Sequence, residues 1–225
     1  MAERERVHSG VVRTTHWLVA ISFVGLIVSG SAILIAHPRF YWGETGTYST
    51  PAWLDLRLDP VYGHTGWGRS LHFLSAWVFA SSGFLYIAAG LVSRHFRSNL
   101  LPSKAELSSS AVTSVLRLRF LRRSEAAAAW RYNVIQKLSY LIVVFALCPA
   151  MVWTGLAMSP AMSAQYPFLA AAFGGHQSAR TLHFIVANLL LLFLVVHVTM
   201  LVLVGFGTHV RAMVTGYRRS SEGGA

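Results

Sequence analysis

The stretch that decides the fold is residues 181–206, TLHFIVANLLLLFLVVHVTMLVLVGF, an apolar run long enough to cross a membrane as a helix. It contains two histidines, His183 and His197, fourteen residues apart. At 100° per residue this spacing falls about 40° short of four whole turns, so both rings lie on nearly the same helix face, about 20 Å apart along the axis. Because an ionisable side chain inside a bilayer is costly, we interpret both as functional residues.

The rest of the chain has the composition of an integral membrane protein. Of its 225 residues 54% are hydrophobic and only 12% are charged, whereas a soluble domain carries about 25% charged residues. Four apolar stretches reach the roughly twenty residues that a spanning helix needs, namely residues 16–36, 71–92, 134–158 and 181–206. We therefore expect an all-α, integral membrane four-helix bundle, with residues 1–225 forming a single domain. The first apolar run is too long for a signal peptide and is expected to remain.

The distribution of basic residues predicts the orientation of the chain. The formal net charge is +11, and Lys and Arg divide into fifteen on one side of the four spans and four on the other. The positive-inside rule then places both termini and the loop of residues 93–132 in the cytoplasm. Cations that flank spans in this way do not form the basic stripe that a nucleic-acid partner requires, so we expect no nucleic-acid binding.

The two longest loops suggest different surroundings. Residues 103–106, Ser-Lys-Ala-Glu, form a capping-box pattern ahead of alternating apolar residues and arginines, which indicates either a basic helix lying on anionic lipid or a solvated loop. The outer loop, residues 37–70, is rich in Trp, Tyr, Pro and Gly and is longer than a connection needs, so we expect it to offer a docking surface. Cys148, the single cysteine, is interpreted as an apolar filler.

Two more histidines begin other spans and complete two pairs. With the amino terminus inside, His72 and His183 lie at the outer level of the membrane, and His16 and His197 at the inner level. A lone metal ion usually takes three or four protein ligands, whereas iron in a porphyrin needs only two axial ones. Two imidazoles at each level therefore favour two b haems over zinc or copper.

Arginines precede three of these histidines at a constant spacing. Arg13, Arg69 and Arg180 each stand three residues before a histidine that begins a span. From there a guanidinium could form a charge-assisted pair with a haem propionate at the membrane surface. Ordinary snorkelling of a long cationic side chain at the end of a span is the alternative.

The third span begins with a polar face on its cytoplasmic side. Asn133, Gln136, Lys137 and Tyr140 occupy positions i, i+3, i+4 and i+7 of a helix. Amide and ammonium donors in an apolar groove are suited to the carbonyl groups of a quinone. The alternative is a helix end that polar groups anchor at the membrane interface.

These residues resemble the bacterial diheme cytochrome b561-type family, which includes the membrane cytochrome b subunits of formate dehydrogenase, nickel–iron hydrogenase and thiosulfate reductase. Four motifs carry the resemblance: Thr15-His16-Trp17, Arg69-Ser-Leu-His72-Phe, Tyr132-Asn-Val-Ile-Gln-Lys137, and Arg180-Thr-Leu-His183 through to His197. Single histidines on the first two helices and a spaced pair on the fourth distinguish the pattern from respiratory cytochrome b and ferric reductases. Ala76-Trp-Val-Phe79 and Gly83-Phe-Leu-Tyr86 resemble members encoded beside a periplasmic molybdopterin oxidoreductase, although His176 stands where that branch favours arginine.

The resemblance implies a fold of four helices with two b haems in the bacterial inner membrane. His72 and His183 would hold the outer haem, and His16 and His197 the inner one. Asn133, Gln136 and Lys137 would line a pocket for ubiquinone or menaquinone near the inner haem.

The family's role is to carry electrons between the quinone pool of a respiratory chain and a partner outside the membrane. That partner is expected to be a periplasmic oxidoreductase subunit, of the molybdopterin type or another, or a c-type electron carrier. The chain itself is expected to act on no substrate other than quinone or quinol. Two other classes stay open, a metal or haem transporter that uses intramembrane histidines and a cofactor-free membrane anchor.

Overall fold

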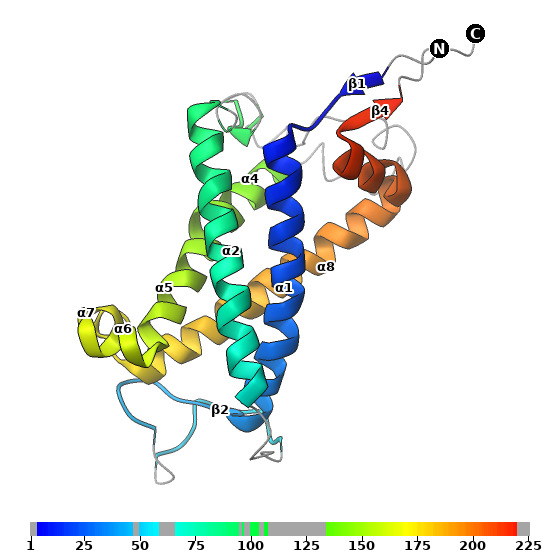
Figure 1. Cartoon of the computed structure of the whole chain (residues 1–225). Helices are drawn as coiled ribbons and strands as arrows, with labels where there is room; N and C mark the ends of the chain where they lie inside the picture. The colour runs from blue at the N-terminus through cyan, green and yellow to red at the C-terminus, as the bar shows by residue number, and fades with distance from the viewer. Residues whose placement is uncertain are drawn as a thin grey trace. The chain divides into compact units, whose positions relative to one another are not determined.

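A computed structural model describes residues 4–46, 50–58, 66–94, 96, 100–103, 106–107 and 134–219 (Figure 1). These residues are mainly helical, and four helical segments are long and apolar enough to cross a membrane, which confirms the predicted all-α membrane fold. The spanning segments are α1 (Gly10–Ala36), α2 (Gly66–Val92), a segment that joins α4 (Val134–Ile142), a π-helical turn (Val143–Leu147) and α5 (Cys148–Met158), and α8 (His176–Thr215). Two short helices, α6 (Pro160–Gln165) and α7 (Phe168–Ala171), precede α8.

Three of these helices extend beyond the apolar runs. Relative to the predicted spans, α1 begins six residues earlier, α2 five residues earlier and α8 five residues earlier, while the third segment covers residues 134–158 as expected. The added turns contain the polar residues Arg13, Arg69 and Arg180. A hydropathy pattern therefore marks the part of a helix at membrane depth, whereas backbone hydrogen bonding continues through the interface.

The chain divides into two compact units, which are considered separately. Unit 1 comprises Met1–His16, Phe84–Phe145 and Phe193–Ala225, and unit 2 comprises Trp17–Gly83 and Ala146–Leu192. His16 and His197 belong to unit 1, and His72 and His183 belong to unit 2. Each of the two expected histidine pairs therefore lies within one unit.

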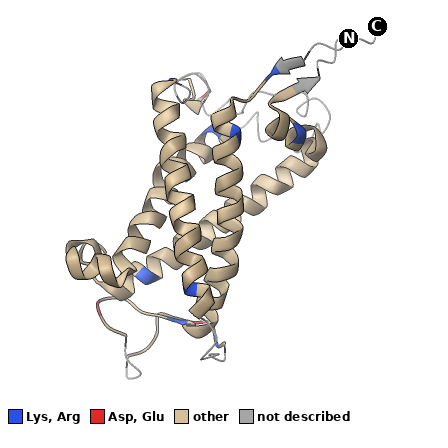
Figure 2. Cartoon of the chain, viewed as in Figure 1, with Lys and Arg blue, Asp and Glu red and all other residues tan. Residues whose placement is uncertain are grey.

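The charged side chains lie at the ends of the helices. Figure 2 shows Lys, Arg, Asp and Glu near the helix ends and in the connections, while the long central parts of the helices carry none that is described. Each spanning segment has a mean hydropathy between 1.5 and 2.8 over its most apolar window. This distribution suits helices whose middle turns lie in hydrocarbon.

Proline explains the irregular turn in the third span. Pro149 has no N–H to donate to the carbonyl four residues earlier, and the π-helical turn Val143–Leu147 lies directly before Cys148 and Pro149.

In unit 1, α8 is interrupted at Gly205, whose φ of 121° suits glycine and few other residues. His209 Nδ1 lies 3.0 Å from the carbonyl oxygen of Gly205, so the interrupted turn keeps a hydrogen bond.

The first and last segments of the described chain meet in unit 1. Strand β1 (Arg4–Arg6) pairs antiparallel with β4 (Tyr217–Arg219), with Arg6 opposite Tyr217. Between them, Gly216 ends α8 with a φ of 88° and its N–H donates to the carbonyl of Ala212 at 2.8 Å. The two terminal segments therefore lie side by side.

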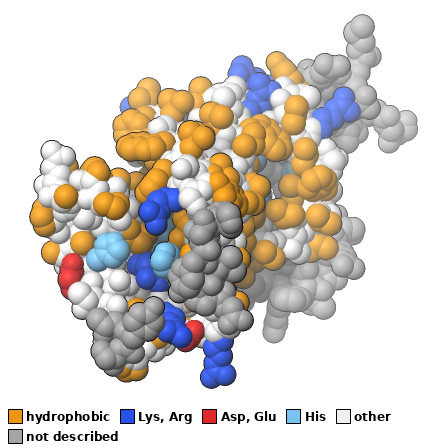
Figure 3. All heavy atoms as spheres, turned by 60° about the horizontal axis from the view of Figure 1, so that its bottom comes forward, with side chains coloured by type: hydrophobic (Ala, Val, Ile, Leu, Met, Phe, Trp, Pro, Cys, Tyr) orange, Lys and Arg blue, Asp and Glu red, His pale blue; other side chains and the backbone are white. Residues whose placement is uncertain are grey.

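In unit 2 the loop that follows α1 folds onto the start of α8. Strand β2 (Arg39–Phe40) pairs with β3 (Leu54–Asp55), and the N–H groups of Gln177 and Ser178 donate to the carbonyl of Gly43 at 3.0 and 3.2 Å. A carboxylate oxygen of Glu44 accepts from the N–H of His176 at 3.2 Å, which places a negative charge at the positive end of the α8 dipole. Figure 3 shows histidine, arginine and acidic side chains gathered on this face. The loop was expected to offer a docking surface, and its base forms a cap on α8.

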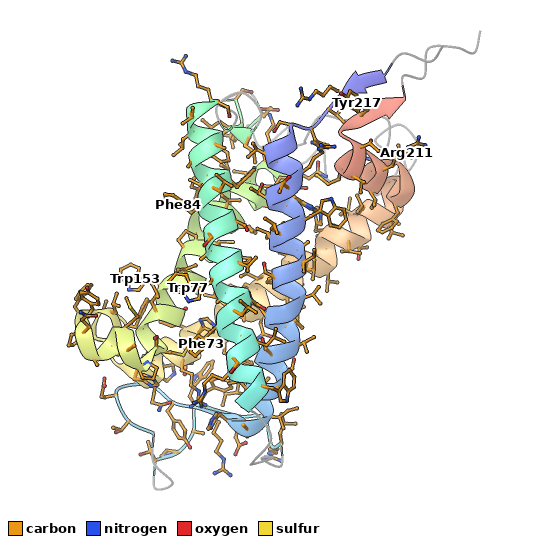
Figure 4. All side chains as sticks on the ribbon, in the orientation of Figure 1. Phe73, Trp77, Phe84, Trp153, Arg211 and Tyr217 are labelled. Atoms are coloured by element: carbon orange, nitrogen blue, oxygen red, sulfur yellow. The ribbon has the colours of Figure 1, made fainter. Side chains whose placement is uncertain are left out.

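The outward faces of the spans carry large apolar side chains. Figure 4 shows Phe73, Trp77 and Phe84 on α2 and Trp153 on α5, and these side chains are 44%, 68%, 75% and 47% exposed. In water such exposure would be unfavourable, whereas lipid tails solvate these groups.

The interior between α1 and α2 in unit 2 is instead lined by small residues. A Cβ atom built on Gly25 would lie 2.5 Å from Ser75 Oγ, so these two helices approach closely.

Candidate functional site

The structure brings His72 of α2 and His183 of α8 together in unit 2. Their ring centroids are 6.2 Å apart, with the ring planes inclined at 59°. Both residues lie in spanning helices, and they are separated by 111 positions in the sequence. The two side chains therefore face each other at one level of the membrane segment.

Each ring of this pair contacts a hydroxyl group from a further helix. Ser29 Oγ of α1 lies 3.0 Å from His72 Nδ1, and Thr154 Oγ1 of α5 lies 2.9 Å from His183 Nδ1. Both hydroxyl residues are fully buried, with 0% and 1% exposure. All four spanning segments thus contribute a side chain to the group formed by His72, His183 and their two hydroxyl partners.

A glycine follows each hydroxyl residue and leaves room for the ring. A Cβ atom on Gly30 would lie 3.6 Å from Cε1 of His72, and one on Gly155 would lie 3.4 Å from Cε1 of His183. These distances correspond to van der Waals contact, so each ring rests against a backbone without a side chain. A bulky residue at either position would displace the imidazole.

The second pair lies in unit 1, where the rings of His16 and His197 interact electrostatically. His197 is also packed against aromatic side chains. Phe193, one turn earlier in α8, is stacked on it with a centroid distance of 5.7 Å and an interplanar angle of 24°, and Tyr140 of α4 contacts it edge-on at 6.2 Å. His197 is therefore in contact with two aromatic rings, whereas His72 and His183 each contact a hydroxyl group.

The predicted polar face of the third span adjoins this inner pair. Tyr140 belongs to that face and contacts His197 directly. Lys137 Nζ donates to both carboxylate oxygens of Glu106, at 2.9 and 3.1 Å, and only 15% of the Lys137 side chain is exposed. Asn133 lies outside the described residues, and Gln136 lies on α4 one position before Lys137. Lys137 is therefore an ion-paired residue.

The pairing with Lys137 stabilises the charged form of the Glu106 carboxyl. The hydrogen bond from Lys137, followed by one from the backbone N–H of Ser103, holds the pKa of the Glu106 carboxyl below its ordinary value. The capping-box contacts are also present, with Ser103 N to Glu106 Oε2 at 2.7 Å and Glu106 N to Ser103 Oγ at 3.3 Å. The basic helix expected after this box lies outside the described residues.

The three arginines predicted to reach haem propionates have different surroundings. Arg180 donates to the backbone carbonyls of His37 and Arg39 and lies over the ring of Phe40, 5.0 Å from its centroid. Arg13 Nη1 donates to the carbonyl of Val214 at 2.8 Å, near the end of α8. Arg13 Nε is buried and has no hydrogen-bond partner among the described residues. Arg69 is exposed.

Two of the remaining histidines that were expected on the outer side can be described. Desolvation, followed by the positive charges of Arg180 and Arg69, lowers the pKa of His37, so this ring is neutral at pH 7. His176 begins α8, and its backbone N–H is bound by Glu44. His64, whose role the sequence left open, lies outside the described residues.

Comparison with known proteins identifies the family. The family described as prokaryotic cytochrome b561 matches residues 7–216, which is nearly the whole chain. The chain belongs to this family. Similarity also extends to a protein of Azospira oryzae that is named, provisionally, as the protein-methionine-sulfoxide reductase subunit YedZ1. The two are 29% identical over 203 residues, which cover 88% of this chain and 91% of the relative.

Membership of the cytochrome b561 family makes the chain a haem-binding membrane protein of electron transfer. The outer pair fits the geometry that a haem iron demands. With metal–nitrogen bonds of about 2 Å, and about 1 Å from each nitrogen to its ring centre, two axial imidazoles hold their ring centres about 6 Å apart. The 6.2 Å between His72 and His183 agrees with this value. Among the described residues, no group of three or more His, Cys, Asp or Glu side chains could hold a bare metal ion.

Sequence reasoning missed Ser29, Thr154 and Glu106 of this cytochrome b561. Both hydroxyl residues belong to a short pattern, Ser29-Gly-Ser-Ala and Thr154-Gly-Leu-Ala, that recurs on two helices. That recurrence is a signal that the sequence contains, although small residues in membrane helices more commonly serve close packing. Glu106 was recognised only as a capping residue, because nothing in the sequence indicates its approach to Lys137.

Proposed function

We propose that this cytochrome b561 is a diheme electron carrier that links quinone in the membrane to an oxidoreductase on the periplasmic side. The observation that carries the proposal is the facing pair His72 and His183, whose ring centres are 6.2 Å apart inside spanning helices. The electrostatic interaction between His16 and His197 supports a second site of the same kind. Haem b bound at these sites supplies reversible one-electron chemistry of iron.

Each pair of imidazoles would hold one haem. His72 and His183 would serve the outer site, and His16 and His197 the inner site. Arg13 supports a role near the inner site, because its Nε is buried with no hydrogen-bond partner among the described residues and is available for a propionate oxygen. Arg69 and Arg180 would act at the outer surface.

Quinone would bind at the polar face of the third span, next to the inner pair. Tyr140 supports this location because it belongs to that face and contacts His197. Lys137 and Gln136, with Asn133, would offer donors to the quinone carbonyl oxygens. Quinol and quinone differ by two electrons and two protons, and the one-electron chemistry of haem b held by the two pairs would suit their exchange one electron at a time.

The partner would be a soluble oxidoreductase that docks on the face formed by the outer loop and the start of α8. The Azospira oryzae relative is named, provisionally, as a subunit of a protein-methionine-sulfoxide reductase, which supports a reductase as the partner. The motifs at residues 76–79 and 83–86, which resemble members encoded beside a periplasmic molybdopterin oxidoreductase, favour a reductase of the molybdopterin type. A c-type electron carrier is the alternative partner at the same face. Location in the bacterial inner membrane follows from this role.

The number of haems per chain tests the proposal. The purified protein should show the spectrum of low-spin b haem and two haems per chain in a pyridine haemochrome assay. His197→Ala should retain one haem and lose reduction by quinol, because the inner site would have a single ligand. His209→Ala, a change on the same helix at a residue that bonds to Gly205, should keep both haems. A wild-type protein without haem would rule out the proposed electron carrier. It would favour a metal or haem transporter or a cofactor-free membrane anchor.

A further inference from the structure

The two outer imidazoles are held by hydroxyl groups in closely matched arrangements. Ser29 Oγ lies 2.6 Å from the carbonyl oxygen of Gly25, four residues earlier in its helix, and 3.0 Å from His72 Nδ1. Thr154 Oγ1 lies 2.7 Å from the carbonyl oxygen of Ala150, again four residues earlier, and 2.9 Å from His183 Nδ1. The same pattern thus occurs on α1 and on α5.

The number of protons at each hydroxyl determines the direction of its hydrogen bonds. A hydroxyl group has one proton to donate, and a backbone carbonyl can only accept. Because each hydroxyl lies at a short distance from a carbonyl of its own helix, its proton is directed there. Its contact with the ring must then be one in which the oxygen accepts and Nδ1–H donates.

This direction fixes the tautomer of both rings. A neutral imidazole carries one proton, so a protonated Nδ1 leaves Nε2 with the lone pair that a metal ligand requires. Residues that bind the second nitrogen of a ligating histidine orient the ring and increase its basicity. Gly30 and Gly155 leave space for the two rings, because a Cβ atom at either position would already be at van der Waals distance from the edge of the ring.

We infer that Ser29 and Thr154 are positioning residues of the outer haem, which accept Nδ1–H hydrogen bonds from His72 and His183 and so present Nε2 of both rings to the iron. The inference rests on the proposed diheme function and extends it to one of the two sites. His197 of the inner pair is packed against Phe193 and Tyr140, so its environment differs. Changes to the two hydroxyls should therefore affect the outer haem alone.

The test uses the purified full chain with its haems bound, and the variants Ser29→Ala and Thr154→Val. Low-temperature electron paramagnetic resonance should show two low-spin ferric signals, and the outer one is identified as the signal missing from His183→Ala. Loss of the Nδ1–H acceptor reduces the electron donation of the imidazole to iron. The outer midpoint potential should therefore rise and the outer signal should shift or broaden, while the inner signal and potential stay at the wild-type values.

Two kinds of control separate this role from packing. Ser22 and Ser31 lie on α1 and bond to the carbonyls of Leu18 and Ile27, so Ser22→Ala and Ser31→Ala should leave both signals unchanged. Thr154→Ser keeps the hydroxyl and should restore the wild-type outer signal, even if Thr154→Val fails to assemble. Two haems with unshifted outer signals in Ser29→Ala and Thr154→Val would overturn the inference and leave the diheme proposal intact. A wild-type chain without haem would rule out both this inference and the diheme proposal.

Discussion

At the scale of residues, the ion pair between Glu106 and Lys137 is the contact that most affects the quinone proposal. Lys137 is mostly buried, and both carboxylate oxygens of Glu106 lie within 3.1 Å of its Nζ. A lysine held in this way cannot move freely to meet a quinone carbonyl. Glu106 therefore belongs to the candidate quinone site, as the residue that sets the position of the Lys137 ammonium.

Removing the charge of Glu106 should weaken the use of quinol. In Glu106→Gln the ammonium of Lys137 loses its acceptor of opposite charge, so the KM for quinol in haem reduction should rise by a few-fold with two haems still bound. Lys137→Ala should have the larger effect, about tenfold or more in kcat/KM, because a hydrogen bond to a charged group contributes about 1.5–3 kcal/mol. Steady-state reduction of the haems by a soluble quinol analogue measures both.

The dependence on pH provides the control for this prediction. Since the pKa of Glu106 is held below its ordinary value, the ion pair is complete above that ordinary value and is lost as the pH falls through the lowered pKa. Wild type and Glu106→Gln should therefore differ at pH 7 and converge in acid. A difference that persists unchanged at low pH would contradict a role for the charge.

At the scale of elements, the approach of α1 and α2 in unit 2 depends on small residues. A Cβ on Gly25 would meet Ser75 Oγ at 2.5 Å, and Ser75 can relieve an alanine by rotating, whereas a leucine has no room. Gly25→Leu should lower the free energy of unfolding by about 1–3 kcal/mol through overpacking. Thermal unfolding in detergent, followed by loss of the haem absorption, measures the change.

Gly83 offers a matched control for this substitution. It lies on α2, and nothing is found within 4 Å of the position of its Cβ. Gly83→Leu should therefore leave stability unchanged or raise it, because leucine favours a helix over glycine by up to about 1 kcal/mol. Equal destabilisation by the two changes would contradict the packing argument.

These elements also show what the sequence could predict. Hydropathy found the four spanning segments, because twenty apolar residues have few alternatives to a membrane helix. Helix periodicity and charge counting paired His72 with His183, and the structure brings these rings together. The contacts of Ser29 and Thr154 were beyond such reasoning, since a hydroxyl in a membrane helix usually bonds to its own backbone. Strands β1 and β4 have three residues each, too few to produce a pattern.

At the scale of the whole molecule, the proposed function depends on which side of the membrane each loop faces. The pairing of β1 with β4 places the two terminal segments side by side, which agrees with the four spans found among the described residues, since four spans return the chain to the side on which it began. Charge counting assigns this side to the cytoplasm, with fifteen of the nineteen basic residues on it. The proposed function needs that orientation, because the His72 and His183 pair must face a periplasmic partner.

Cysteine labelling tests the orientation directly. Cys148 is the single cysteine, so Cys148→Ala gives a background without thiols. In that background, Thr45→Cys in the exposed outer loop should react with a membrane-impermeant maleimide on intact spheroplasts. Ser93→Cys, at the exposed far end of α2, should react only after the membrane is opened. The reverse pattern would place the His16 and His197 pair, with the proposed quinone site, on the periplasmic side. The face proposed for the partner would then lie in the cytoplasm, which would contradict a periplasmic partner.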